Sequence, residues 1–155
     1  MKLVVLSVGR VRQQFVRDGE EEYLKRLKGG LQVELQELGL EAPESMSAPE
    51  VQEREGREVL KRIKDGDYVV ALDERGKSLS SKEVGAFIAS RMNAGTKTLW
   101  LVIGGAYGLS GEVRRRADLL LSLSALTFPH QLARLVLIEQ LYRSYTLLKG
   151  ISYHK

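Results

Sequence analysis

The sequence predicts one α/β domain, in which a mainly parallel sheet is flanked by helices. Apolar runs alternate with helical patterns along the whole chain, and no repeat, low-complexity tract or Ser/Gly linker interrupts them. The 155 residues are 43% hydrophobic and 28% charged, which is typical of a globular protein and not of a disordered one. A chain of this length can bury a core of its own, so we expect residues 1–155 to form a single domain.

Five strands are expected from short runs rich in Val, Leu and Ile. The second run alternates apolar and polar residues, and the third is a continuous apolar run of the kind that is buried on both faces of a sheet. Because helical patterns separate the runs, we expect the strands to pair mainly in parallel. The expected strands cover residues 2–8, 31–35, 68–73, 97–103 and 119–123.

Helical periodicity fills the segments between these strands and the end of the chain. Ser80 followed by Glu83 forms a capping box, which predicts the start of the third helix. Pro129 suits the first turn of the last helix, where its missing N–H costs nothing, and Gly150 ends that helix. The expected helices cover residues 18–28, 50–64, the segment from Ser80 to about Met92, 111–117 and 129–149.

Composition excludes several classes of protein. There is no cysteine, so disulfides and thiolate metal sites are excluded, and two histidines are too few for a multi-histidine metal cage. The longest uncharged apolar stretch, near residues 119–128, is far shorter than a membrane span, and the N-terminus resembles a first strand more than a signal peptide. We therefore expect a cytoplasmic protein that needs no metal and no membrane.

The charge is distributed unevenly between the two halves of the chain. Residues 1–75 contain 13 Lys and Arg against 16 Asp and Glu, whereas residues 76–155 contain 11 against 4. The basic half suits a polyanion such as RNA. An ordinary solvated basic surface explains the same numbers equally well, so the charge alone leaves both interpretations open.

Ligands of open α/β sheets bind beyond the carboxyl ends of the strands, and three of those ends have unusual sequences. Residues 72–77 follow the third strand, and a plain turn with Gly76 at positive φ is favoured there over a ligand contact. Residues 104–111 follow the fourth strand and contain four glycines, which favours a ligand close to the backbone. The spacing fits neither a dinucleotide fingerprint nor a P-loop, and the first strand is followed only by Gly9, so a nicotinamide site is disfavoured.

The third unusual end follows the fifth strand and leads into the last helix. Residues 122–128 are small or hydroxylated at several positions, which leaves backbone groups accessible to a planar heterocycle. His130 begins the last helix, where a histidine is either a structural cap or a catalyst.

The last helix is apolar around most of its circumference. We expect this helix to lie in the interface of a symmetric homodimer, the alternative being a helix buried within a monomer. Arg134, Arg143 and Lys149 lie on it, and Tyr153, His154 and Lys155 follow it. These cations and aromatic rings suit an RNA strand and a flipped base, although a frayed, solvated end is the simpler interpretation of the tail.

Three segments of the sequence resemble the ribosomal large-subunit methyltransferase H family. They are LVIGGAYGLS at 101–110, LSLSALTFPH at 121–130 and LIEQLYR at 137–143, and the final Tyr-His-Lys is similar too. Members of this family are small SPOUT-class enzymes that methylate N3 of a pseudouridine in helix 69 of 23S rRNA. The resemblance extends over essentially the whole chain and is most specific in the last fifty residues. It implies an α/β fold with a C-terminal trefoil knot, which is a rare exception to unknotted topology.

The resemblance also implies a homodimer that uses S-adenosyl-L-methionine and acts on 23S rRNA, which we expect to be within the assembled ribosome. It places the target base near His130, Tyr142, Arg143, Tyr153 and His154, with the partner subunit completing the RNA side of the site. Lys155 stands where relatives often have Arg, and so lacks the planar fork for a bidentate phosphate contact. The implied cofactor contacts are Leu72, Gly104, Gly105, Ser124, Ala125, Leu126, Thr127, Phe128 and Pro129.

Methylation at N3 requires loss of the N3 proton, so the family's chemistry implies a general base. His130 and His154 are the candidates, and direct loss of the proton to water is the alternative. Two other functions remain open: another SPOUT-type RNA methyltransferase, acting on a ribose 2′-hydroxyl or a different base, and a non-enzymatic RNA-binding α/β module.

Overall fold

The computed structural model describes residues 1–40 and 42–153, which form a three-layer α/β domain. Within those residues five strands make one sheet in the order β2-β1-β4-β3-β5, and each pair of neighbours is parallel. This confirms the predicted fold class. The strands are β1 (Lys2–Val8), β2 (Gln32–Leu38), β3 (Tyr68–Ser78), β4 (Thr98–Ile103) and β5 (Leu119–Ser122).

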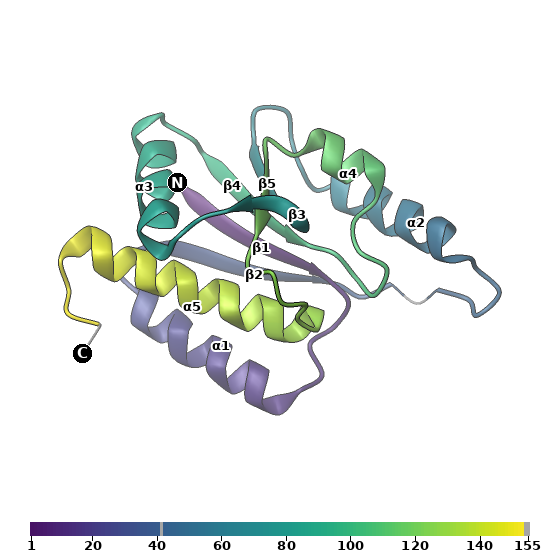
Figure 1. The fold of residues 1–155 in the computed structure, drawn as a ribbon, viewed down its shortest axis with the longest axis horizontal. Helices are drawn as coiled ribbons and strands as arrows, with labels where there is room; N and C mark the ends of the chain where they lie inside the picture. The colour runs from purple at the N-terminus through teal and green to yellow at the C-terminus, as the bar shows by residue number, and fades with distance from the viewer. Residues whose placement is uncertain (41, 154–155) are drawn as a thin grey trace.

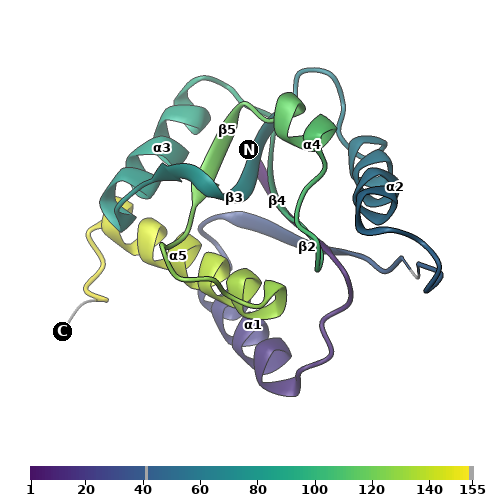
Figure 2. The ribbon, with the colours of Figure 1, turned by 45° about the vertical axis from the view of Figure 1, so that its right-hand side comes forward.

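Helices cover both faces of the sheet, as Figures 1 and 2 show. Alternate residues of the strands point to opposite faces, so β1 contributes Leu3 and Val5 to one core and Val4 and Leu6 to the other. The first core packs against α3 and α5, with α1 beside α5, and the second packs against α2 and α4. The helices are α1 (Gln14–Leu27), α2 (Ala48–Leu60), α3 (Ser81–Asn93), α4 (Gly111–Arg116) and α5 (His130–Lys149).

The predicted helices are all present, with shifts of a few residues at their ends. The capping box at α3 is confirmed: the Glu83 N–H donates to Ser80 Oγ at 3.3 Å, and the Ser80 N–H donates to the Glu83 carboxylate at 2.7 Å. Pro129 is the N-cap of α5 and not part of its first turn, and Gly150 ends the helix at φ +65°. The trefoil knot stays a prediction from the family resemblance.

The turn predicted at residues 72–77 is wrong, because β3 continues through it to Ser78. The register between β3 and β5 shifts between Leu72 and Lys77, so the strand is irregular there but resumes pairing with β5. Gly76 does not have a positive φ. A Cβ at this position would lie 2.6 Å from the backbone of Leu121. Gly76 is therefore required by the close approach of two backbones and not by a turn.

The hypothesis that Arg134 contacts RNA is also wrong. Its side chain is 3% exposed, and its Nε lies 2.5 Å from Glu20 Oε1 of α1. Arg134 Nη1 donates to Ser7 Oγ at 2.7 Å, so the guanidinium joins α5 to α1 and to the end of β1. A charge buried in this way positions the start of α5 and is not available to a phosphate.

Candidate functional site

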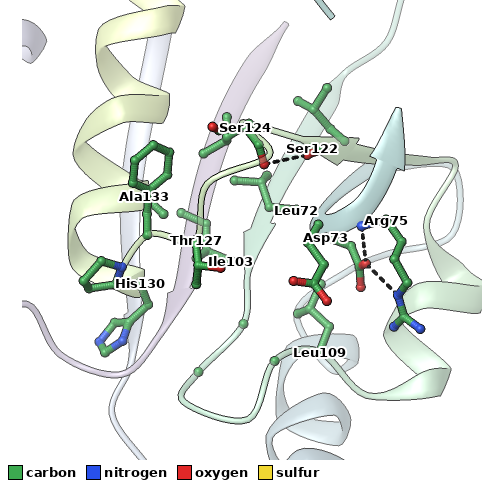
Figure 3. Close-up of a pocket in the computed structure, with 18 of the residues that line it drawn as sticks. Leu72, Asp73, Arg75, Ile103, Leu109, Ser122, Ser124, Thr127, His130 and Ala133 are labelled. Atoms are coloured by element: carbon green, nitrogen blue, oxygen red, sulfur yellow. Dashed lines mark hydrogen bonds and ion pairs between the residues drawn. The ribbon is translucent and has the colours of Figure 1, made fainter. Parts of the chain in front are cut away.

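A cavity of about 470 Å³ opens at the carboxyl ends of β4 and β5, beside the irregular part of β3 (Figure 3). This is the edge of the sheet at which α/β proteins bind ligands, and the volume is in the usual range for small-molecule sites. Its walls come from three segments that are far apart in the sequence: residues 72–75, 103–109 and 121–130, with Arg114 and Ala133 completing the lining.

The cavity brings together most of the residues that the sequence singled out. Leu72, Gly104, Gly105, Ser124 and the segment 126–130 all line it. Ala125 is not among its lining residues, although both of its neighbours are. The three strand ends that the sequence marked as unusual are thus walls of a single cavity.

The glycine-rich segment after β4 folds back on itself as a tight loop. The Gly108 N–H donates to the Gly105 carbonyl at 3.0 Å, and Gly108 has φ +80°. A Cβ at Gly104 would lie 2.7 Å from the carbonyl carbon of Gly108, which real structures do not tolerate. The glycines therefore allow the chain to double back, and they leave bare backbone at the cavity wall.

The segment after β5 is held by its own hydroxyl groups. Ser122 Oγ donates to the Ser124 carbonyl at 3.1 Å, and the Leu126 N–H donates to Ser124 Oγ at 2.9 Å. Short side-chain bonds of this kind fix a loop that has no regular backbone pairing. Leu126 itself is largely exposed at the cavity.

A carboxylate that sequence reasoning did not select lies on the opposite side of the cavity from His130 (Figure 3). Asp73 Oδ2 accepts from Arg114 Nε at 2.6 Å, and Asp73 Oδ1 accepts from the Arg75 N–H at 3.0 Å. Burial alone raises the pKa of Asp73, but these hydrogen bonds outweigh it and leave the pKa below its usual range. The position of Asp73 directly after a buried apolar run could have marked it as a candidate site residue. Its pairing with Arg114 of α4 could not be inferred from the sequence.

His130 is the first residue of α5 and reaches the cavity from that end. A Cβ on Gly9 would lie 3.3 Å from His130 Nε2, so the imidazole packs against the backbone just after β1. The neighbouring Gln131 Oε1 accepts from the backbone N–H groups of Arg12 and Gln13, at 2.8 and 3.1 Å. The start of α5 is therefore tied to the loop between β1 and α1.

Tyr142 and Arg143 lie at the other end of α5 and do not line the cavity. The Tyr142 ring stands edge-on to Tyr153 with centroids 4.8 Å apart and packs on Tyr23 at 5.9 Å. Arg143 pairs with Glu139 at 2.7 Å and lies 4.9 Å from the centre of the Tyr153 ring. At a rise of about 1.5 Å per residue, about 18 Å of helix separates Tyr142 from His130. One chain alone does not bring these residues together, and His154 and Lys155 lie outside the described residues.

Residues 1–40 and 42–153 contain no group of three or more His, Cys, Asp or Glu side chains placed to hold a metal ion. Among the helices of the same residues, none combines the length and the apolar character that crossing a membrane requires.

Comparison with known families agrees with this geometry. A family model described as "Predicted SPOUT methyltransferase" matches residues 1–154. The chain belongs to the SPOUT methyltransferase family. Curated SPOUT relatives named "Ribosomal RNA large subunit methyltransferase H" include one from Syntrophotalea carbinolica, 45% identical with 99% of both chains covered, and one from Alkaliphilus oremlandii, 43% identical with 100% of both covered.

Solved structures support the fold of this SPOUT chain. A probable methylase family protein from Haemophilus influenzae Rd KW20 aligns with a TM-score of 0.57 at 13% identity, covering 99% of this chain and 70% of that one. TrmJ from Z. mobilis ZM4 aligns with a TM-score of 0.55 at 13% identity, covering 94% and 70%. At such low identity the two comparisons support the shared SPOUT fold alone.

Proposed function

We propose that this protein methylates N3 of a pseudouridine in helix 69 of 23S rRNA, with S-adenosyl-L-methionine as the methyl donor and the assembled ribosome as substrate. The observation that carries the proposal is the cavity formed by the irregular part of β3 and the loops after β4 and β5. Full-length relatives named as large-subunit rRNA methyltransferases support the substrate class. The position on the RNA comes from the family resemblance of the segments at 101–110, 121–130 and 137–143.

The lining residues fit an adenosyl group. Apolar side chains of Leu72, Ile103, Leu109 and Leu121 suit a flat heterocycle, and the glycine loop and the 122–129 segment offer bare backbone donors and acceptors. When bound, S-adenosylmethionine supplies a methyl group that is already activated by the sulfonium. The task of the chain is then to hold the acceptor nitrogen in line with that methyl group and to exclude competing water.

The acceptor nitrogen carries a proton that has to leave. His130 lies at the edge of the cavity and is the described residue that suits a general base there. We assign it that role, with direct proton loss to water as the alternative. The proton then passes from N3 to His130 Nδ1 or Nε2 and from there to solvent.

The ring cluster at the end of α5 is assigned to the RNA side of the site. Within one chain, Tyr142 and Arg143 are too far from His130 to share a base with it, so the proposal requires a homodimer in which the partner subunit provides them. The exposed apolar side chains of Leu147, Leu148 and Ile151, which are 43%, 42% and 48% exposed beside this cluster, support an interface at this end.

The test has a binding arm and a reaction arm. Calorimetry is expected to show one S-adenosylmethionine bound per chain. Ribosomes from a strain that lacks the gene are expected to gain one methyl group, which mass mapping of rRNA fragments places at a pseudouridine in helix 69. Methylation of a ribose or of another base would support a different SPOUT activity, and no binding of the cofactor would support a non-enzymatic RNA-binding module.

The substrate form is tested by comparing naked 23S rRNA with intact ribosomes. We expect ribosomes to be the better substrate. Equal rates on both would contradict that part of the proposal.

Association of the protein with RNA is also expected to weaken steeply as the salt concentration rises, since phosphate contacts release counterions.

A further inference from the structure

A buried carboxylate oxygen next to the cavity has no partner. Within the described part of the chain, three buried side-chain nitrogen or oxygen atoms lack a hydrogen bond. Two of them, Glu20 Oε1 and Arg134 Nε, lie 2.5 Å from each other and are satisfied as an ion pair. The third is Glu55 Oε2 of α2, and no ion pair or hydrogen bond compensates it. Glu55 as a whole is half-buried, but a buried carboxylate oxygen without a partner is costly, so its presence calls for an explanation.

Glu55 lies directly behind the glycine loop of the cavity. A Cβ on Gly105 would be 3.0 and 3.1 Å from the two Glu55 carboxylate oxygens and 3.1 Å from Val8. One turn earlier on α2, Gln52 Nε2 donates to the Tyr107 carbonyl and holds the same loop. Gly105 lines the cavity and Glu55 does not, so the backbone of the glycine loop lies between the Glu55 carboxylate and the cavity.

We propose that Glu55 provides the negative charge that recognises the cationic form of the cofactor through the Gly105 backbone. The inference rests on the proposed function, because it concerns how that cofactor is selected. S-adenosylmethionine carries a positive sulfonium, whereas the thioether left after methyl transfer does not. A carboxylate in a poorly solvated position attracts the cation and gives no such advantage to the neutral product. The site then binds the donor more tightly than the product and releases the product readily.

The electrostatic surroundings of Glu55 agree with this role. Burial raises the pKa of its carboxyl group, and no nearby cation in the described chain offsets the effect. A cation placed in the cavity would supply that compensation. Without a ligand the charged form is therefore less stable than in an exposed carboxyl group, and a positive ligand in the cavity would stabilise it.

The test is calorimetry with three ligands on one variant. The ligands are S-adenosylmethionine, S-adenosylhomocysteine and an analogue that carries an amine in place of the sulfonium. For Glu55→Gln, which keeps the size of the side chain, affinity for the two cationic ligands is expected to fall roughly tenfold, as for unit charges several ångströms apart in partly screened protein. Affinity for the neutral thioether is expected to be unchanged. Glu53→Gln, an exposed position on the same helix, is the matched control and leaves all three affinities unchanged.

The outcomes separate this inference from a merely structural role. An equal loss for all three ligands, or no loss for any, would overturn it, because a side chain that only shapes the loop does not distinguish ligand charge. Glu55→Asp keeps the charge and is expected to recover part of the preference for the cationic ligands; failure to do so while the fold is retained would also count against it. If the wild-type protein binds none of the three, the proposed function itself fails, and this inference with it.

Discussion

The two ends of α5 are built in different ways. At its first turn, His130 faces a cavity whose walls include two loops, which glycines and short serine hydrogen bonds hold in place. At its last turns, Tyr142 and Arg143 belong to a cluster of side chains, in which rings stack edge-on and a guanidinium lies over Tyr153. The first end suits the binding of a small rigid ligand, and the second suits contact with the surface of a macromolecule.

This difference shows how one helix serves two parts of a proposed reaction. A cavity with tightly folded glycine and serine loops in its walls tolerates few substitutions in those loops. A cluster of side chains at an exposed helix end depends on each side chain and on what covers it. Since about 18 Å of helix lies between them, the two ends of one chain act on one base only if a second chain contributes. The predictions below test each end and the segment between them.

The largest effect is expected from Gly104→Val. The new side chain meets the backbone of Gly108, so the loop cannot keep its path and S-adenosylmethionine binding is lost. Calorimetry measures the binding, and circular dichroism checks that the fold persists. Gly29→Ala is the control: Gly29, unlike Gly104, has a positive φ, but nothing lies within 4 Å of its Cβ position and it does not line the cavity, so cofactor affinity is expected to be unchanged. Normal binding by Gly104→Val would show that this loop is not a cofactor wall.

Arg134→Ala tests the segment between the two ends. The change leaves Glu20 buried without its partner, which is expected to lower the free energy of unfolding by about 3–5 kcal/mol in urea titration. Replacing both residues with leucine removes the unpaired charge and is expected to restore most of the stability. Lys25→Ala, which removes an exposed pair with Glu21, is the control with little effect. A small loss for Arg134→Ala would mean that the buried pair does not position α5.

His130→Ala is expected to lower turnover roughly a hundredfold while cofactor affinity persists, because a positioned general base contributes on that scale. Single-turnover methylation of ribosomes measures this loss of turnover.

Mixing equal amounts of His130→Ala and Arg143→Ala chains tests whether the two ends of α5 in one site come from different chains. If each site uses one end from each chain, random pairing restores about a quarter of wild-type activity, since half the dimers are mixed and one site in each is intact. No recovery would place both ends in the same chain's site.

A smaller effect is expected at the cavity wall opposite His130. Asp73→Asn removes a carboxylate that is ionised and hydrogen-bonded in the folded protein. The substitution is expected to lower the free energy of unfolding by about 2 kcal/mol at neutral pH. The native pKa of Asp73 is lowered, so the stabilisation is fully present above the unfolded value near 3.9 and is lost as pH falls through the native value. The difference in the free energy of unfolding between wild type and Asp73→Asn should therefore disappear below about pH 4. Asp65→Asn, a change at an exposed position, is expected to leave the free energy of unfolding unchanged both at neutral pH and below about pH 4.

The fold was predictable because its signals are local and repeated. Short apolar runs separated by helical patterns predict a parallel α/β sheet, and a capping box at Ser80 predicts a helix start that the structure contains. Gly76 was not predictable in the same way. A glycine required by a turn and one required by the close approach of a neighbouring strand look alike in sequence, and the partner at Leu121 is 45 residues away in the chain.

The candidate site was predictable where backbone forms it and not where side chains pair across the fold. Glycines and small residues at strand ends predicted the walls at 104–109 and 122–130. Asp73 pairs with Arg114 of α4 and Arg134 pairs with Glu20 of α1, and both partners are distant in sequence. Glu55 Oε2 of α2, by contrast, is buried without a partner in the described part of the chain. Whether each charge is paired or unpaired therefore depends on tertiary packing. The place of Tyr142 and Arg143 relative to His130 likewise depends on the length of helix between them and, in the proposed homodimer, on a second chain.

The pairing of β1 has a consequence for how the chain folds during synthesis. β1 occupies the interior of the sheet between β2 and β4, and Leu3 pairs with Leu99. At about 5–20 residues per second, translation delivers that partner roughly 5–20 seconds after β1 emerges. Until then only β2 and the nearby helices can cover one of the most apolar segments of the protein. The early half of the nascent chain is accordingly expected to need chaperone protection, and the native sheet to form only once β4 has left the exit tunnel.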